Sequence, residues 1–325
     1  PIDLLMQPHP LRRRLNANKL VGFLVLFAAS LSIAMFTGVM SRQLRSSVRR
    51  AGSFQRATAP RSAVIRRCMA TNARAQDKRV SIAPYFTVPL ENMAKFKALF
   101  RDFYKCVDNE PNCFYYGFTV DEKSGVVFNR ECYDSAEGLI KHIENTADVG
   151  AQAGALCSDV RLEIHAPKEE AAKLEAIAKD INAQIFVMDE DGFVNNNMET
   201  GKPDTSVSIH PYFKVSEEKW DAFVATHPEY YKLVKANEPD CHMYCFSHNK
   251  EAGIVFNRES YKNAEALLNH IENTKPANEI ADGLFESVDL EIHGPAAELE
   301  KLESVAKEIG ARVFVADADS RVYKQ

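Results

Sequence analysis

One pattern of apolar and polar positions occurs twice in this chain, 128 residues apart. The two copies are VVFNRECYDSAEGLIKHIENT (126–146) and IVFNRESYKNAEALLNHIENT (254–274), identical at 14 of 21 positions. The first part of each copy alternates apolar and polar residues, which predicts a strand. The second part has apolar residues at Ala136, Leu139 and Ile143, a spacing that predicts a helix. Each copy is therefore expected to form a strand that runs directly into a helix.

The same order of elements is predicted around both copies. The first repeat, 79–190, and the second, 205–319, each give strand, helix, strand, strand, helix, strand, helix, strand, and a polar linker, 191–204, separates them. This is the order of the α+β ferredoxin-like fold with an added helix and strand. Such a sheet has helices on one face only. We therefore expect the two bare faces to meet in one chain as a pseudo-dimeric α/β-barrel that encloses a pocket.

Residues 1–78 differ from the rest of the chain in composition. Residues 1–76 hold 13 of the 40 Lys and Arg residues and only Asp3 of the 45 acidic residues. Residues 20–40 form an uncharged run of 21, long enough to span a bilayer. Residues 41–76 contain nine Arg, many Ser and Ala, and no acidic residue. The first segment is typical of a secretory signal and the second of a transit peptide.

Together these segments resemble the bipartite presequences that carry proteins into plastids bounded by extra membranes. Residues 1–78 are therefore predicted to be a targeting presequence, and the mature protein to be a plastid protein that is not bound to a membrane. Two alternatives remain open from the sequence: a mitochondrial route, and a membrane anchor formed by 20–40.

The remaining residues are strongly acidic, with 27 Lys and Arg against 44 Asp and Glu, a formal charge of −17 compared with −5 for the whole chain. Such a body repels phosphate backbones, so nucleic acid is not predicted as a partner, and anionic membrane surfaces are disfavoured for the same reason. The seven cysteines show no CxxC spacing. Cys241 and Cys245 would lie roughly 13 Å apart along a strand, too far for a disulfide or a shared ion. The sequence thus predicts neither a disulfide framework nor a metal site.

The repeated strand places polar side chains on one face. Asn129, Glu131 and Tyr133 point one way, and Phe128 and Arg130 the other. The first set suits a pocket for a small polar aromatic molecule, and the second repeat has Asn257, Glu259 and Tyr261 in the same places. The alternative is structural: the glutamates form cross-strand ion pairs with neighbouring arginines, and the tyrosines are packed rings.

His142 and His270 follow on the helices, at the flank of each apolar stripe. From there they reach either the pocket or the solvent. In the pocket, beside Glu131 and Glu259, their near-neutral pKa would suit them to take the proton of a phenol or quinol.

A later strand carries Glu163 and His165 on one face, matched by Glu291 and His293 in the second repeat. Each Glu-x-His pair could orient its histidine or bind metal. We favour a structural role, because a metal site needs three or four ligands and this spacing supplies two. The remaining candidates for the pocket lie on the first strand of each repeat: Tyr85, Tyr212 and His210, which replaces Ala83. Pro84 and Pro211 on these strands predict an edge or a bulge.

The combination of a strand ending in Glu-x-aromatic and a following helix with His resembles the antibiotic biosynthesis monooxygenase superfamily, which includes quinol monooxygenases. The residues that carry it are Glu131, Tyr133 and His142, and again Glu259, Tyr261 and His270. The resemblance implies a dimeric α/β-barrel fold, here in two tandem copies. It also implies oxygenation without a bound cofactor, in which the deprotonated substrate itself reduces oxygen.

The expected function is therefore a cofactor-independent monooxygenase that acts on a small quinol or phenol and dioxygen, with His142, His270, Glu131 and Glu259 as catalytic residues. Flavin and nicotinamide fingerprints are absent from the sequence. The alternative is a non-catalytic barrel that binds a small hydrophobic ligand or assists other proteins under stress. A third reading, if 20–40 is retained, is a membrane-tethered assembly factor. Association of the pseudo-dimer into larger oligomers remains open.

Overall fold

The protein is represented by a computed structural model that describes residues 15–16, 74–195 and 197–324. The apolar run 20–40 and most of the Arg-rich segment, up to residue 73, lie outside these residues. No helix in the described part is long and apolar enough to cross a membrane. The following description therefore concerns the two repeats, the linker and the segment that leads into them.

Both repeats form the predicted order of elements. The first contains β3 (Ser81–Thr87), α2 (Leu90–Ala98), α3 (Phe100–Val107), β4 (Cys113–Asp121), β5 (Val126–Tyr133), α4 (Ala136–Asn145), α5 (Ala147–Gly154), β6 (Asp159–Ala166), α6 (Lys168–Asp180) and β7 (Ala183–Met188). The second contains β9 (Ser208–Lys214), the 3₁₀ turn η1 (Glu217–Lys219), α7 (Trp220–Val224), α8 (His227–Asn237), β10 (Cys241–Asn249), β11 (Ile254–Tyr261), α9 (Ala264–Asn273), α10 (Lys275–Ala281), β12 (Ser287–Gly294), α11 (Ala296–Ile309) and β13 (Arg312–Ala316).

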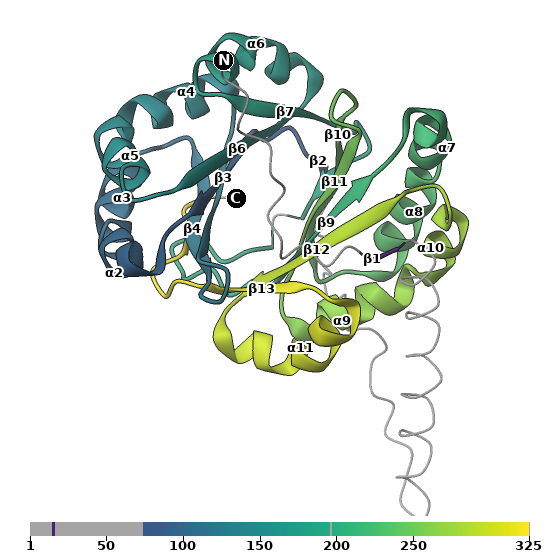
Figure 1. Ribbon diagram of the computed structural model, residues 1–325. Helices are drawn as coiled ribbons and strands as arrows, with labels where there is room; N and C mark the ends of the chain where they lie inside the picture. Colours follow the sequence, from purple (N-terminus) through teal and green to yellow (C-terminus); the bar gives the residue numbers. More distant parts are fainter. Residues whose placement is uncertain (1–14, 17–73, 196, 325) are drawn as a thin grey trace, which may run out of the picture.

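The strands of both repeats join into one closed barrel. Among the described residues, ten strands pair in the order β11, β9, β12, β13, β4, β5, β3, β6, β7, β10, and β10 pairs again with β11. The halves meet where β7 pairs with β10 and β13 with β4. The helices lie outside this ring, on the outer face of each sheet (Figure 1). The protein is therefore an α+β barrel with a helical outer layer.

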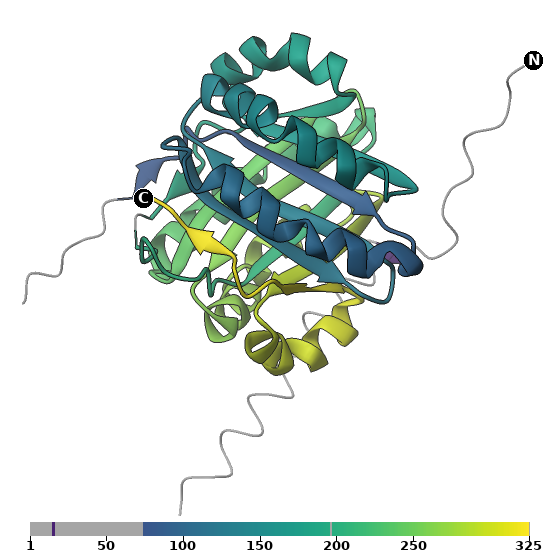
Figure 2. The same cartoon turned by 90° about the vertical axis from the view of Figure 1, so that its left-hand side faces the viewer.

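Four two-residue strands extend the sheet: β1 (Leu15–Asn16), β2 (Ala75–Gln76), β8 (Phe193–Val194) and β14 (Arg321–Val322). The last two lie 128 residues apart, and each crosses to the other half: β8 pairs with β10 of the second repeat, and β14 with β4 of the first. Figure 2 shows β14 beside the first repeat, next to the C-terminus. The linker and the C-terminal end thus help to hold the halves together.

The folded body also includes residues just before the expected boundary at 79. β2 pairs with β8, and the Asp77 carboxylate forms a buried ion pair with Arg258 of the second half. The matching pair, Arg130 with Asp204, joins the first half to the linker at 2.6 Å. Both pairs cross the junction between the halves, so removal of either partner would leave a charge inside the protein.

Local details follow the sequence signals. Gly125 and Gly253 adopt φ values of 70° and 64° in the turns between β4 and β5 and between β10 and β11, a conformation that glycine adopts without strain. Pro84 lies on β3, which has a neighbouring strand on each side, β5 and β6, so β3 is not an edge strand. The ladder between β3 and β5 is instead interrupted between the Val80–Tyr133 bridge and the Tyr85–Phe128 pair.

Candidate active site

The strand-to-helix corner that repeats in the sequence begins each helix with a capped turn. The Ser135 side chain accepts a hydrogen bond from the Gly138 amide at 3.2 Å, and Asn263 does the same for Ala266 at 3.0 Å. Polar caps of this kind satisfy amides that have no partner within the helix. The cap fixes where the helix starts, and so it sets the position of the histidine two turns later.

In the second repeat, His270 on α9 lies between two carboxylates. Its Nε2 is 3.1 Å from Glu259 Oε2 on β11, and its Nδ1 is 3.0 Å from Glu238 Oε2 at the end of α8. Thr274 donates a hydrogen bond to the His270 carbonyl at 2.9 Å and so supports the helix at this point. The three residues form a buried Glu–His–Glu relay.

The first repeat contains the same relay. His142 Nε2 lies 3.0 Å from Glu131 Oε2, and His142 Nδ1 lies 3.0 Å from Glu110 Oε2. Both histidines are buried, at 4% and 7% exposure, which excludes the alternative that they face solvent. Sequence reasoning did not find Glu110 and Glu238. The signal available in the sequence is a Glu-Pro pair that follows each preceding helix, at 110–111 and 238–239.

Burial and charge act against each other on these groups. Burial disfavours a charged imidazole, but Glu131 and Glu110 outweigh it and raise the pKa of His142 to about 9. The pKa of His270 is raised in the same way: burial opposes the charge, and Glu259 and Glu238 favour it. Burial raises the pKa of the Glu259 carboxyl to about 7, against the opposing effect of His270. Glu259 is thus tuned for proton transfer near neutral pH.

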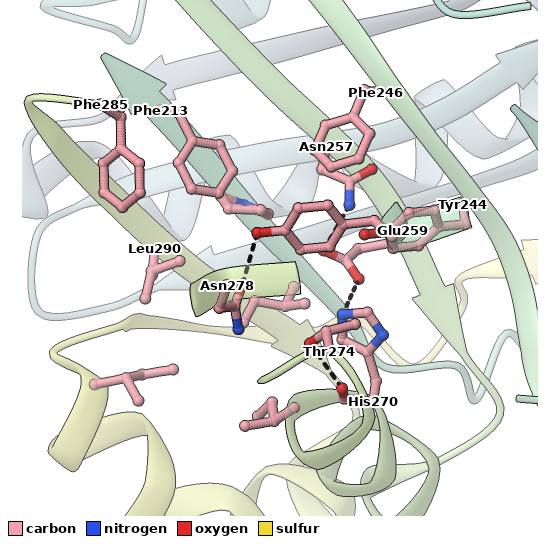
Figure 3. A pocket seen from close by; sticks show the side chains of 15 residues that line it. Phe213, Tyr244, Phe246, Asn257, Glu259, His270, Thr274, Asn278, Phe285 and Leu290 are labelled. Carbon is pink, nitrogen blue, oxygen red and sulfur yellow. Dashed lines mark hydrogen bonds and ion pairs between the residues drawn. The ribbon is translucent and has the colours of Figure 1, made fainter. Parts of the chain in front are cut away.

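Glu259 and His270 line a cavity between the sheet of the second repeat and its helices. The centres of water molecules can occupy about 80 Å³ of this cavity. On the same measure one water needs about 10–15 Å³, so the cavity holds several. The walls are mostly apolar, and Phe213, Phe246 and Phe285 are among them (Figure 3). The cavity therefore has room for a small aromatic ring beside an ionisable carboxylate.

Polar side chains also line this cavity. Asn257 donates to Glu259 Oε1 at 3.2 Å, while its own Oδ1 is buried without a hydrogen-bond partner among the described residues. On another side Tyr230 donates to Asn278 Oδ1 at 2.8 Å. Tyr261 lies behind Glu259 and donates a hydrogen bond to Glu259 Oε2. Asn257 therefore offers a free acceptor to a hydroxyl-bearing ligand.

This location corrects the expectation that the pocket lies between the two bare sheet faces. Asn129, Glu131 and Tyr133, like Asn257, Glu259 and Tyr261, lie on the face that the helices cover: the His142 and Tyr133 ring centres are 4.9 Å apart. Phe128 and Arg130 point into the barrel instead. The prediction that Asn129, Glu131 and Tyr133 share one face of the strand is confirmed. The pattern of a single strand does not indicate which of its two faces the helices cover.

The barrel interior is filled by the other predicted residues. Tyr85 and Tyr212 meet at 2.8 Å between their hydroxyl oxygens; Tyr85 also contacts Glu291, and Tyr212 contacts Glu163, each at 2.8 Å. Arg161 and Arg312 neutralise these glutamates. Two cavities described inside the barrel measure about 20 and 30 Å³, room for one or two waters.

The three remaining candidate histidines also lie inside the barrel. His165 and His293 bind Ser247 and Thr119 through their Nδ1 atoms at 2.8 and 2.7 Å, and His210 packs beside His293 with ring centres 4.2 Å apart. The candidates taken from the sequence are therefore split between two faces of the sheet. The group inside the barrel joins the halves, and the group under the helices borders a cavity.

The chain was compared with family models, curated sequences and solved structures, and only the solved structures gave matches. No family model matches the chain, and no curated protein sequence matches it. Among solved structures, MupZ from Pseudomonas fluorescens is 34% identical over 34% of this chain and 90% of MupZ, with a TM-score of 0.32. The matched share is about the length of one repeat.

Two further structures match. A "putative antibiotic biosynthesis monooxygenase" from Caulobacter crescentus is 26% identical over 27% of this chain and 88% of that protein, with a TM-score of 0.26. A "putative monooxygenase" from Lactobacillus acidophilus is 14% identical over 66% of this chain and 92% of that protein, with a TM-score of 0.47. Since a relative is 34% identical along nine-tenths of its own length, and the residues that suggested the family occur in both repeats, the chain belongs to the antibiotic biosynthesis monooxygenase superfamily.

Proposed function

We propose that this protein is a monooxygenase that oxidises a small phenol or quinol with dioxygen, in the cavity of the second repeat and without an organic cofactor. The observation that carries the proposal is the Glu259 carboxylate, which lies at the junction of an apolar cavity and a charged relay. We also propose that the two repeats stand for the two subunits of a dimeric barrel, so that one chain supplies what two subunits supply elsewhere in the superfamily.

The proposed chemistry begins with proton removal. Glu259 takes the hydroxyl proton of the substrate, and His270 and Glu238 stabilise the charge that the relay then holds. The phenolate is electron-rich, so it can transfer electrons to dioxygen and combine with it at a ring carbon. Loss of water then leaves a carbonyl at that carbon. A phenol with one free ring C–H thus gives a quinone: one oxygen atom of O₂ enters the ring, and the other leaves as water.

This assignment shifts the base from histidine to glutamate. Both nitrogens of His270 face carboxylates, at 3.0 and 3.1 Å, and these carboxylates raise the pKa of the ring, which favours its protonated form. A protonated imidazole cannot accept the substrate proton. Glu259 Oε1, in contrast, accepts only from Asn257 among the described residues, so it has capacity for one more donor.

A non-catalytic ligand-binding barrel remains the second candidate, and one observation favours it. The same relay exists in the first repeat, where, among the cavities found in the described part of the chain, Glu131 borders only the one of about 30 Å³ inside the barrel. Glu110 of the same relay borders an open hollow of about 560 Å³ whose walls include Lys105, Asn109 and Lys141. Among the cavities in the described part of the chain, the mostly apolar one borders only the second relay, which favours a structural role for the first. Binding of a hydrophobic ligand without turnover would identify this second function.

The test is oxygen uptake by the full chain with a panel of monocyclic and bicyclic phenols and quinols, with ¹⁸O₂ to follow the oxygen atoms. We expect one labelled oxygen in the quinone product and one in water. Glu259→Gln should lower turnover about 100-fold or more, the usual contribution of a general base. The matched control, Glu131→Gln, should stay within about twofold of the unaltered protein.

Three outcomes would overturn the proposal: no oxygen uptake with any member of the panel, equal losses in the two glutamine variants, or product without ¹⁸O. A ligand that co-purifies with the protein and is released unchanged would support the second candidate instead.

A further inference from the structure

A cluster of one carboxylate and two imidazoles lies outside the cavity, where the first repeat ends against the second. Asp189 follows β7, His227 begins α8, and His248 lies near the end of β10. Asp189 Oδ2 is 2.9 Å from His227 Nδ1, and Asp189 Oδ1 is 3.0 Å from His248 Nε2. One donor atom from each residue lies within 4.8 Å of the other two. The three residues thus converge on one point from three separate elements.

We propose that Asp189, His227 and His248 bind a divalent transition-metal ion, with Zn²⁺ as the preferred ion. Two imidazole nitrogens and one carboxylate oxygen are ligands that Zn²⁺ commonly takes. Donor atoms about 2.0–2.1 Å from one ion in a tetrahedron lie about 3.3 Å apart, close to the contacts observed. A water molecule would complete the fourth position.

Hydrogen bonding alone does not account for the cluster. His248 Nε2 is buried and lies 3.0 Å from the Asp189 carboxylate, yet it forms no hydrogen bond with any described residue. Among the described residues, no Lys or Arg forms an ion pair with Asp189, so the two imidazoles are the ion-pair partners of this carboxylate. A cation at the point where the three donors converge would satisfy both the nitrogen and the carboxylate.

The surroundings hold the donors and leave a path for the ion. The Tyr231 hydroxyl donates to Asp189 Oδ2 at 3.2 Å and accepts from the Phe246 amide at 2.9 Å, which fixes the carboxylate. The His227 ring stacks on Phe246 with ring centres 3.8 Å apart. The side chains of His248 and Asp189 are 17% and 21% exposed, so an ion can enter from solvent at this side.

The opposite junction, where the second repeat ends against the first, provides a natural control, because it has the same carboxylate without the imidazoles. Asp317 lies 128 residues after Asp189 and accepts a hydrogen bond from Tyr104 at 3.0 Å, as Asp189 does from Tyr231. Phe100 stacks on Phe118 at 4.0 Å, in the way that His227 stacks on Phe246. Val120 takes the place of His248. Of these two junctions, both within the described residues, the one at Asp189 therefore has all three donors in this position.

A second cluster, His210, Glu291 and His293 inside the barrel, has the same ligand types but a less suitable charge environment. Glu291 already forms an ion pair with Arg312 and accepts a hydrogen bond from Tyr85 at 2.8 Å. A cation placed there would meet a guanidinium that already neutralises the carboxylate. This cluster serves as the competing site in the experiment.

The test is titration of the chelator-treated full chain with Zn²⁺ by calorimetry, with Co²⁺ absorption spectra to report the coordination geometry. We expect one ion per chain, a tetrahedral Co²⁺ spectrum without a thiolate band from nearby Cys245, and a higher melting temperature with Zn²⁺. His248→Gln and Asp189→Asn should each weaken binding about 100-fold or more, since even partners behind the ligands contribute 10–100-fold.

Asp317→Asn and His210→Gln should bind Zn²⁺ as the unaltered chain does. His248 lies at the rim of the cluster, so His248→Gln should keep its melting temperature without zinc even if Asp189→Asn fails to fold. The proposal is overturned if the chain binds no Zn²⁺, if His248→Gln binds it normally, or if His210→Gln is the variant that loses it. The result does not depend on oxygenase activity, because the cluster does not line the cavity.

Discussion

The two halves of the barrel contain the same relay but differ in what surrounds it. Glu110, His142 and Glu131 in the first half match Glu238, His270 and Glu259 in the second, with histidine-to-carboxylate distances of 3.0–3.1 Å in both. The second half adds polar and aromatic groups at the cavity: Tyr230, Asn278 and Phe285 occupy the positions of Phe103, Gly150 and Cys157.

These larger side chains line the cavity of the second half instead of filling it, because neighbours hold them. Tyr230 is bound to Asn278, and Phe285 packs against Phe213 with ring centres 5.1 Å apart. The comparison teaches that the relay belongs to the fold of the repeat, whereas the mostly apolar cavity borders it in the second half. Duplication leaves one copy free to specialise while the other keeps a structural role.

The largest expected effect concerns the ion pairs that join the halves. Asp77→Asn should lower the free energy of unfolding by about 3–5 kcal/mol, because it leaves the Arg258 guanidinium buried without a counter-charge. Asp204→Asn should cost about half as much, since Arg130 keeps hydrogen bonds to Ser206 and Ser260. Urea unfolding of both variants measures the difference.

If Asp77→Asn and Asp204→Asn lower the free energy of unfolding equally, the two ion pairs contribute equally to stability and the expected difference is wrong. The same buried pair predicts that a chain beginning at residue 79, without Asp77, is as unstable as Asp77→Asn, which urea unfolding of that shortened chain would check.

The next effect tests the structural role of the relay in the first half. The pKa of His142 is about 9 in the folded protein and about 6.5 when unfolded. Its stabilisation is therefore fully present below pH 6.5 and is lost as the pH rises through 9, a change of about 3 kcal/mol. Unfolding measured at pH 6 and pH 10 should show this loss, and His142→Gln should remove most of it. A pH dependence that is unchanged in the variant would contradict the assignment.

A smaller effect, on the pH dependence of turnover, distinguishes the relay of the second half from that of the first. With Glu259 as the proposed base, turnover should rise about tenfold per pH unit below its pKa of about 7 and level off above it. His270 lowers the pKa of Glu259 through its charge, so His270→Gln should move the midpoint to higher pH. His142→Gln, as the matched variant, should leave the midpoint where it is. A shift caused equally by both variants would mean that the two relays act together.

The smallest effect concerns recognition in the cavity. Tyr230→Phe removes one hydrogen bond to Asn278 and should change kcat/KM about fivefold, a difference of about 1 kcal/mol. The change should depend on whether the substrate has a second hydroxyl, because Asn278 is then free to bind it. Phe103→Tyr in the first half should have no effect on kcat/KM. Equal changes for substrates with one and with two hydroxyls would exclude this role.

The sequence predicted the order of strands and helices, the repeat and the candidate residues on the strand-to-helix corner. These follow from local periodicity, which requires only neighbouring residues. The apolar pattern of residues 90–109 predicts a single helix, but the structure divides this segment into α2 and α3 at Leu99. Its apolar periodicity continues through Leu99, so the pattern gave no signal for the break.

Periodicity determined that Asn129, Glu131 and Tyr133 share a face, and that Tyr85, Glu163 and His165 lie on strands of the same repeat. Only the tertiary structure decided that the first set lies beneath the helices and the second inside the barrel, because a strand pattern separates two faces without saying what covers each. The partners of the histidines, Glu110 and Glu238, come from segments that follow other helices. Contacts between distant segments depend on how the elements pack, and no spacing along the chain encodes them directly.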